Sequence, residues 1–294
     1  MSDLEKGTAS LASVGSFDFD QLLLEGGAEI APAIAAILEA ADKPNLERLV
    51  AALERVFPRP QFRKAQLGER LLPHLFALAA AAEDSLTLAS LLDHGGGHLR
   101  ERGRLAEAET FYRRALSIRE IALDAGHPDL AKSLNNLAGL HHDQDRLAEA
   151  EPLAVRALAI LEKSPETNER ALAISLNNLA MLYQSLGRLA EAEPIFRRAL
   201  ALNQKAHGAE HPVVATSLNN LAMLYQAQHR LAEAEPLHVR ALAIREQALE
   251  ADHPDLAASL ENFGDLYQRR GLPQKAEPLL KRARAIREKT PAGP

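Results

Sequence analysis

Apolar residues recur every three or four positions over most of the chain, which is the spacing of one face of an α-helix. In the stretch 172–186 these positions form a single stripe that ends at Gly187. Glycine commonly ends a helix because it adopts a positive φ at no steric cost. A second stripe follows over residues 189–206, so the pattern predicts two helices joined by a tight turn. The first stripe consists of Leu172, Leu176, Leu179, Ala180 and Tyr183.

This predicted helix pair is one copy of an internal repeat. The string LAEAE and its relaxed copy PQKAE recur at steps of 42 residues, beginning at Leu105, Leu147, Leu189, Leu231 and Pro273. The string SLNN and its variant SLEN keep the same step and begin at Ser133, Ser175, Ser217 and Ser259. A His-Pro dipeptide begins at His127, His211 and His253. Three markers in one register indicate an array of helix pairs, each burying its apolar face against its neighbours.

The spacing inside one copy resembles that of a known family. Residues 179–199 contain the motif Leu-Ala-x-x-Tyr-x-x-x-Gly-x-Leu-x-x-Ala-x-x-x-Phe-x-x-Ala. This motif is similar to the tetratricopeptide repeat, and the 42-residue period with its paired asparagines resembles the kinesin-light-chain type of that repeat. The resemblance implies an all-α fold, a right-handed α-solenoid of stacked antiparallel helix pairs, with a short helical N-terminal region.

The repeat register divides the chain into segments. In the region before the repeats, the apolar pattern predicts two short helices over 28–41 and 44–57 and a further helix over 62–84. The expected segments are a disordered tail (1–16), a short helical region (17–61), a degenerate repeat helix (62–87), five repeats (88–129, 130–171, 172–213, 214–255 and 256–289) and a tail (290–294).

Three features depart from a plain helix pair. The run Gly95–Gly97 falls inside the first predicted helix of the array, where three glycines cost about 2–3 kcal/mol relative to alanine. We therefore expect a distorted helix there, or a flexible entry to the array. The prolines at 152, 194, 236 and 278 predict a local kink near the start of each second helix. The loop histidines at 127, 211 and 253 are expected to order their turns.

Composition narrows the choice of function. The 294 residues carry a formal net charge of −6, which argues against a broad nucleic-acid-binding surface. Cysteine is absent, and this excludes disulfides, thiolate metal sites and cysteine nucleophiles. The first residues lack a basic start followed by an apolar stretch, and no apolar run approaches the roughly 20 residues that span a bilayer. We therefore expect a cytoplasmic protein with no nucleic-acid or membrane partner.

The resemblance also implies where a partner would bind. In such repeats the first helices line a concave groove, and their exposed positions would hold an extended peptide or a partner protein. The paired asparagines suit this role because an amide offers donors and an acceptor to a peptide backbone, although they can equally connect adjacent helices. The methionines between them offer adaptable apolar contact. The expected partner-binding residues are Lys132, Asn135, Asn136, Ile174, Asn177, Asn178, Met181, Gln184, Thr216, Asn219, Asn220, Met223, Gln226, Asn262 and Arg269.

Few residues are candidates for catalysis or metal binding. The SLNN serines recur in every copy, which is not the behaviour of a single nucleophile. His94 and His98 have the spacing of two metal ligands on a helix, but glycines lie between them and a third ligand is not evident. We therefore expect a non-enzymatic scaffold without metal or cofactor. Two alternatives are a module that self-assembles through the open, basic C-terminal helix over 273–289, and the docking or sensor arm of a larger bacterial regulatory complex.

Overall fold

The computed structural model describes residues 43–56, 65–163 and 169–289, and within these ranges it contains twelve helices and no strand. The predicted helix over 28–41 and the two predicted tails lie outside the described residues. The chain divides after Arg146 into two compact bodies, which we call the N-terminal and the C-terminal body. No described helix is long and apolar enough to cross a membrane.

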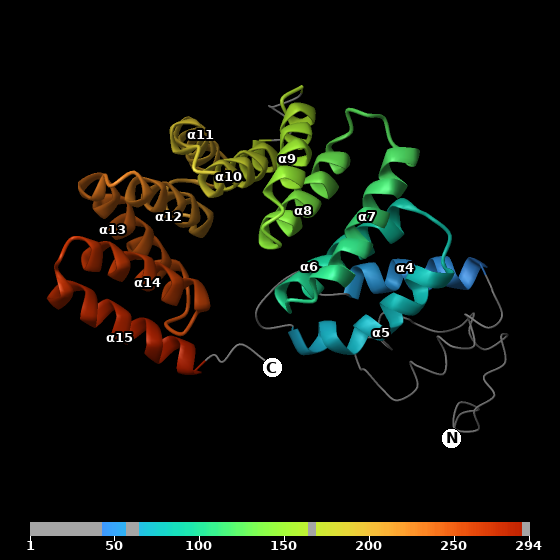
Figure 1. The fold of residues 1–294 in the computed structure, drawn as a ribbon. Coiled ribbons are helices and arrows are strands. Elements are labelled where there is room, and N and C mark those ends of the chain that lie inside the picture. The colour runs from blue at the N-terminus through green and yellow to red at the C-terminus, as the bar shows by residue number, and fades with distance from the viewer. Residues whose placement is uncertain (1–42, 57–64, 164–168, 290–294) are drawn as a thin grey trace, which may run out of the picture. The chain divides into compact units, whose positions relative to one another are not determined.

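Both bodies consist of paired helices (Figure 1). We call the first helix of each repeat the A helix and the second the B helix. In the N-terminal body α6 pairs with α7, α8 packs on α7, and α4 and α5 pack against α6. The helices of this body are α4 (Lys43–Val56), α5 (Ala65–Ala81), α6 (Leu86–Glu101), α7 (Leu105–Ala122) and α8 (Pro128–Asp143). The predicted helices over 44–57 and 62–84 are thus confirmed over 44–56 by α4 and over 65–81 by α5, which ends three residues earlier than predicted.

In the C-terminal body each B helix also packs on the A helix of the next repeat, so the pairs form a stack. The pairs are α10 with α11, α12 with α13 and α14 with α15, and α9 packs on α10. The helices are α9 (Leu147–Leu161), α10 (Glu169–Ser185), α11 (Leu189–His207), α12 (Pro212–Ala227), α13 (Leu231–Ala248), α14 (Pro254–Arg269) and α15 (Pro273–Lys289). The predicted helix pairs of the repeats 88–129, 172–213, 214–255 and 256–289 are therefore confirmed.

In the C-terminal body one core cluster runs from α10 to α15. Phe196 of α11 packs in this core with Tyr225 of α12, and Phe263 of α14 continues it. Small side chains stand where the helices approach one another most closely: Ala180 and Ala192 are both fully buried. A larger residue at these positions would overpack the contact, at a cost of about 1–3 kcal/mol.

The loop histidines cap the A helices that follow them. The Nδ1 atoms of His127, His211 and His253 each accept a hydrogen bond of 3.2 Å from a backbone N–H two residues later. Proline follows each of these histidines and takes the first position of the helix, where no amide donor is needed. The expectation that these histidines order their turns is confirmed.

The turn between A and B helices has a left-handed residue at the same position in every repeat. Gly187 has φ +73°, as its place in the motif predicts. Asp145 and His229 occupy this position with φ 57° and 60°, although they carry a Cβ atom that this region disfavours. The geometry of the turn therefore overrides the preference of the residue.

The glycines of α6 do not break or distort the helix, so both expectations for this segment are wrong. The helix continues through Gly95–Gly97, all three of which are buried. A Cβ atom on Gly95 would lie 2.1 Å from Cδ2 of Leu75, and one on Gly96 would lie 2.6 Å from the ring of Tyr112. The glycines let α5 and α7 approach the backbone of α6, and this packing offsets their low helix propensity.

The LAEAE motif and the arginine before it form a clasp between successive B helices. Arg188 donates to Glu151 of the preceding B helix at 2.6 Å and to its own helix at Glu191, while its guanidinium stacks on Tyr183. The same bonds join Arg230 to Glu193, and Arg146 to Glu109 in the N-terminal body. The Arg146 guanidinium holds the pKa of Glu109 at about 2. These glutamates therefore hold the stack together.

Candidate functional site

Most of the expected site residues of the C-terminal body lie on the side of the A helices away from the core. Ile174 is 58% exposed, and Met181 and Met223 are each 39% exposed. Thr216 and Arg269 are also exposed, whereas Gln184 and Asn262 are half-buried. We define the A-helix face as the adjoining positions of α10 and α12: Ile174, Asn177, Asn178, Met181, Thr216, Asn220 and Met223.

A side-chain amide bond crosses this face. Asn220 Nδ2 donates to Asn177 Oδ1 at 2.8 Å and links α12 to α10. The Nδ2 atom of Asn177 lies 3.4 Å from the sulfur of Met181, so the sulfur acts as a weak acceptor. Among the described residues no donor reaches Oδ1 of Asn220, so this oxygen can accept a hydrogen bond from a ligand. The asparagines thus connect helices and still present a polar group at the surface.

Three of the expected site residues are inside the protein, contrary to the expectation that they line a surface. Asn135, Asn219 and Gln226 are only 7%, 3% and 4% exposed. Asn219 donates to Ser259 at 2.6 Å, and Gln226 donates to Asp265 at 3.1 Å. Both amides therefore join α12 to α14 beneath the face, and a ligand on the surface does not reach them.

A buried histidine completes this polar layer. His238 stands where the preceding repeat has Phe196, and its ring nitrogens lie 3.0 Å from Asn219 Oδ1 and 2.7 Å from Gln226 Oε1. Burial lowers the pKa of His238 to about 4, although Asp265 acts in the opposite direction. The carboxylate of Asp265 accepts from the Gln226 amide, and this fixes the Gln226 oxygen toward the Nε2–H of a neutral ring. Sequence analysis missed this residue; its signal was a histidine at an apolar core position.

A second set of buried contacts joins the B helices α11 and α13 to the serine of the SLNN or SLEN string in the next repeat. Asn203 donates to Ser217 at 2.8 Å, and Arg245 donates to Ser259 at 2.5 Å. Arg245 also donates to the hydroxyl of Thr216 at 2.9 Å and so orients one residue of the face. Burial lowers the pKa of Arg245, against the influence of Asp255. Sequence analysis did not identify these links; their signal was a polar residue 14 positions before Ser217 and before Ser259.

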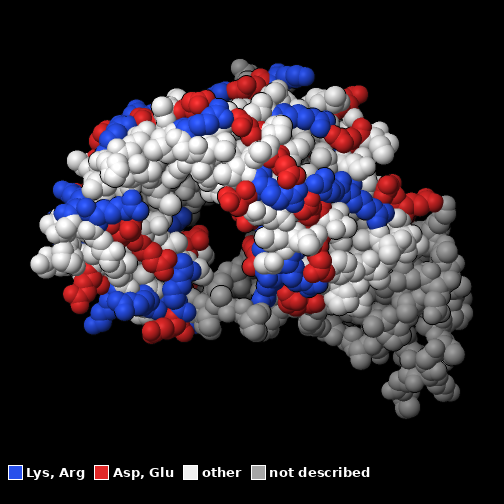
Figure 2. Space-filling view, in the orientation of Figure 1, with Lys and Arg blue, Asp and Glu red and all other residues white. Residues whose placement is uncertain are grey.

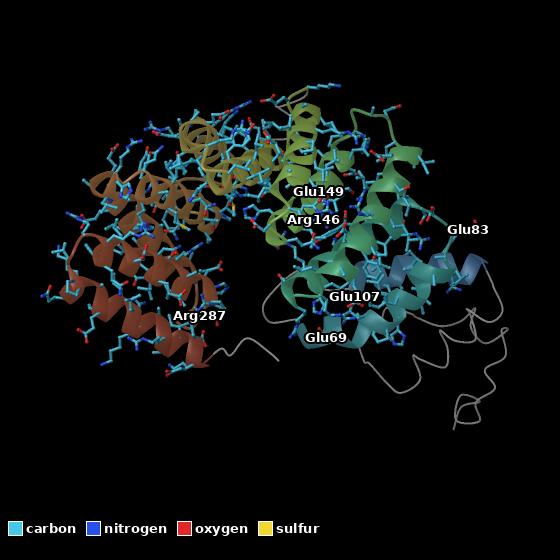
Figure 3. All side chains as sticks on the ribbon, in the orientation of Figure 1. Glu69, Glu83, Glu107, Arg146, Glu149 and Arg287 are labelled. Carbon is cyan, nitrogen blue, oxygen red and sulfur yellow. The ribbon has the colours of Figure 1, made fainter. Side chains whose placement is uncertain are left out.

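Charge is distributed unevenly around the A-helix face. The face itself contains no charged residue, and the acidic groups of α14 beside it are paired. Asp265 contacts Arg269 at 2.7 Å, and Glu261 contacts Arg287 of α15 at 3.0 Å (Arg287 is labelled in Figure 3). Figure 2 shows basic and acidic groups lying beside one another over the outer surface of the C-terminal body. The face is therefore a neutral strip with charge-paired borders.

The corresponding residues of the N-terminal body converge on a buried carboxylate. Asp93 is 4% exposed and contacts Arg119 at 2.7 Å, Asn136 at 3.1 Å and Lys132 at 3.7 Å. The bond from Asn136 repeats the bond from Asn220, because it joins the same two repeat positions. Two of the expected site residues, Lys132 and Asn136, therefore contact Asp93.

The two histidines with metal-ligand spacing contact different carboxylates. His98 lies 3.2 Å from Glu69, and His94 lies 4.0 Å from Glu54. Within the described ranges no group of three or more His, Cys, Asp and Glu side chains could hold a metal ion.

Comparisons with known proteins agree with the repeat register. The tetratricopeptide repeat model matches residues 74–163, 171–247 and 214–289. A putative kinesin light chain with nearly identical TPR-like repeats from Podosopora anserina is 27% identical, with TM-score 0.57, over 72% of this chain and 100% of that one. BtubC (BKLC) from P. vanneervenii is 28% identical, with TM-score 0.58, over 83% of this chain and 91% of that one. Nephrocystin-3 from Xenopus laevis is 44% identical over 59 residues, 20% of this chain and 4% of that protein.

Proposed function

The chain belongs to the tetratricopeptide repeat family, and from that premise we propose that it is a non-enzymatic scaffold that binds an extended segment of a partner protein on its A-helix face. The observation that carries the proposal is the exposed apolar strip of Ile174, Met181 and Met223, interrupted by asparagines. Side chains of this size are usually buried in a soluble protein, and their alignment on adjoining helices favours a partner surface.

The chemistry of the face limits the partner segment. A ligand charge placed over Ile174, Met181 and Met223 would lose water without gaining a counter-charge, so uncharged side chains are favoured there. The free Oδ1 of Asn220 supports contact with a backbone N–H of the ligand. Packed helices lie about 8–10 Å apart and an extended chain rises about 3.3 Å per residue, so about six residues reach from α10 to α14.

The proposal is tested by selecting peptides from a random displayed library, about twice that length, on the immobilised protein. A selected peptide is resynthesised with fluorescein, and its affinity is measured by fluorescence anisotropy. Met181→Glu with Met223→Glu should abolish binding, because both changes place a charge on the neutral strip. The matched control is Val155→Glu with Val239→Glu, since these valines are 43% and 50% exposed on B helices. Equal affinities for the two double variants would place the binding surface elsewhere.

A second pair of substitutions tests the role of the asparagines. Asn178→Ala with Asn220→Ala removes two half-buried amides of the A-helix face while leaving the apolar strip in place. We expect peptide binding to fall at least about tenfold, with helicity by circular dichroism and the melting temperature nearly unchanged. Unchanged affinity would show that the amides serve only to connect the helices.

A further inference from the structure

The only sulfur atoms in the described part of the chain lie on the A-helix face. The sequence has three methionines and no cysteine, and apart from Met1 the methionines are Met181 and Met223. They occupy the same position in successive A helices, 42 residues apart, and each is 39% exposed. A thioether with this exposure is open to reagents in solution.

We propose that Met181 and Met223 are a peroxide-sensitive modification site that switches the A-helix face from apolar to polar; this inference rests on the proposed function. A sulfur lone pair attacks one oxygen of a hydroperoxide, an S–O bond forms and the O–O bond breaks. The sulfur is oxidised by two electrons to the sulfoxide, the peroxide is reduced, and water or an alcohol leaves. Thioredoxin-linked methionine sulfoxide reductase reverses the step.

The sulfoxide changes the face in two ways. It replaces a flexible apolar contact with a strong hydrogen-bond acceptor that a ligand's apolar side chain does not satisfy. The Nδ2 atom of Asn177 already lies 3.4 Å from the sulfur of Met181, so this amide is placed to donate to the new oxygen. Asn177 is also the acceptor for Asn220 at 2.8 Å, so oxidation of Met181 acts on the amide bond that crosses the face.

The two sites differ in a way that serves as an internal control. The contact from Asn177 engages a lone pair of the Met181 sulfur, which makes that sulfur less reactive toward peroxide. The residue at the same place beside Met223 is Asn219, which is buried and donates to Ser259 instead. At equal exposure, Met223 should oxidise faster than Met181 by about twofold to fivefold, the factor that a weak hydrogen bond is worth.

The rates are measured by treating the full chain with hydrogen peroxide, quenching at intervals and quantifying each sulfoxide by peptide mass spectrometry. N-acetyl-methionine amide in the same tube gives the reference rate. We expect both methionines to react within about tenfold of the reference, and the Asn177→Leu variant to bring their two rates together. Methionines that both react more than about a hundredfold slower than the reference would overturn the proposal, whatever the protein binds.

The switch is measured with the fluorescein-labelled peptide selected on the unoxidised protein. Oxidation should weaken binding about tenfold or more with helicity unchanged, and the two reductases together, one for each sulfoxide epimer, should restore it. For the Met181→Leu/Met223→Leu variant, the affinity measured before peroxide treatment and the affinity measured after it should be the same, because no sulfur is left on the face. If the oxidised protein binds as well as the unoxidised one, this inference fails and the proposed function stands. If no peptide is selected at all, both fail.

Discussion

The A helices of the two bodies make the same bond with different chemistry. In the N-terminal body Asn136 donates to Asp93, a buried carboxylate that also contacts Arg119 and Lys132. In the C-terminal body Asn220 donates to Asn177, which is neutral and half-buried. The bond is therefore set by the repeat position. The residue that accepts the bond decides whether the surface around it is charged and covered or neutral and accessible.

The repeat position three residues after Asn136 and Asn220 shows the same contrast. Where the C-terminal body exposes Met181 and Met223, the N-terminal body has Gly139, and the guanidinium of Arg100 lies over it. Arg100 in turn contacts Asp143 at 2.5 Å. Ion pairs thus cover the N-terminal A helices, while uncharged side chains remain accessible on the C-terminal ones. Partner binding is accordingly proposed for the C-terminal body.

The largest expected effect comes from removing the charge at the centre of the N-terminal cluster. Asp93→Ala leaves Arg119, whose side chain is 2% exposed, buried without its counter-ion. We expect the free energy of unfolding of the N-terminal body to fall by about 3–5 kcal/mol, measured by urea denaturation. Asn177→Ala at the same repeat position should cost only about 1 kcal/mol. Similar losses for the two variants would refute the distinction between the bodies.

A glycine pair tests how closely the N-terminal helices are packed. The Cβ atom of Gly95→Ala meets Leu75, which is fully buried, so we expect a loss of about 1–3 kcal/mol despite the better helix propensity of alanine. In Gly139→Ala the nearest atom is the guanidinium end of Arg100 at 3.0 Å, which can move. That variant should be neutral or slightly stabilised in the same denaturation experiment. The packing argument fails if Gly139→Ala loses as much stability as Gly95→Ala.

The left-handed turn position offers a smaller comparison between the bodies. His229→Gly should stabilise the C-terminal body by about 1 kcal/mol, because glycine adopts φ 60° without steric strain. Asp145→Gly should gain less, since the short polar side chain of aspartate tolerates this conformation better than histidine does. Thermal melts followed by circular dichroism measure both changes. A lower melting temperature for His229→Gly would show that the histidine side chain makes a contact that stabilises the fold by more than the backbone strain costs.

The smallest expected effect is a loss of folding stability at low pH. The pKa of Glu109 is held at about 2, below its ordinary value of 4.5, so its clasp with Arg146 stabilises the folded state above about pH 4.5. That contribution is lost as the pH falls toward 2, because the carboxylate is then protonated in the folded state as well. For a partly exposed pair it amounts to about 0.2–1 kcal/mol. Urea denaturation at pH 5 and pH 2.5 should show a smaller drop for Arg146→Leu than for the unmodified chain, and an equal drop would contradict this account.

Local sequence patterns were enough to predict the features that depend on the residues of a single repeat. The helix pairs, the His-Pro caps and the left-handed turn at Gly187 all follow from residues a few positions apart. Contacts between repeats were not predictable in this way. Asn177 and Asn219 share one repeat position, yet only Asn219 is buried, because it donates to Ser259 of the next repeat and packs against the ring of His238. The glycines of α6 illustrate the same limit, since their cost is local and their compensation comes from Leu75 and Tyr112.

The contacts between repeats recur at the same repeat positions, and this has a consequence for the evolution of the gene. An in-frame deletion of residues 188–229 would place Arg230 directly after Gly187, where it meets Glu151 as Arg188 does now. His238 would then face Asn177 and Gln184, which stand one period before its present partners Asn219 and Gln226. Unequal recombination between copies can therefore shorten or lengthen the array while the new neighbours still meet at the same repeat positions, so selection can change the number of copies independently of the residues at those positions.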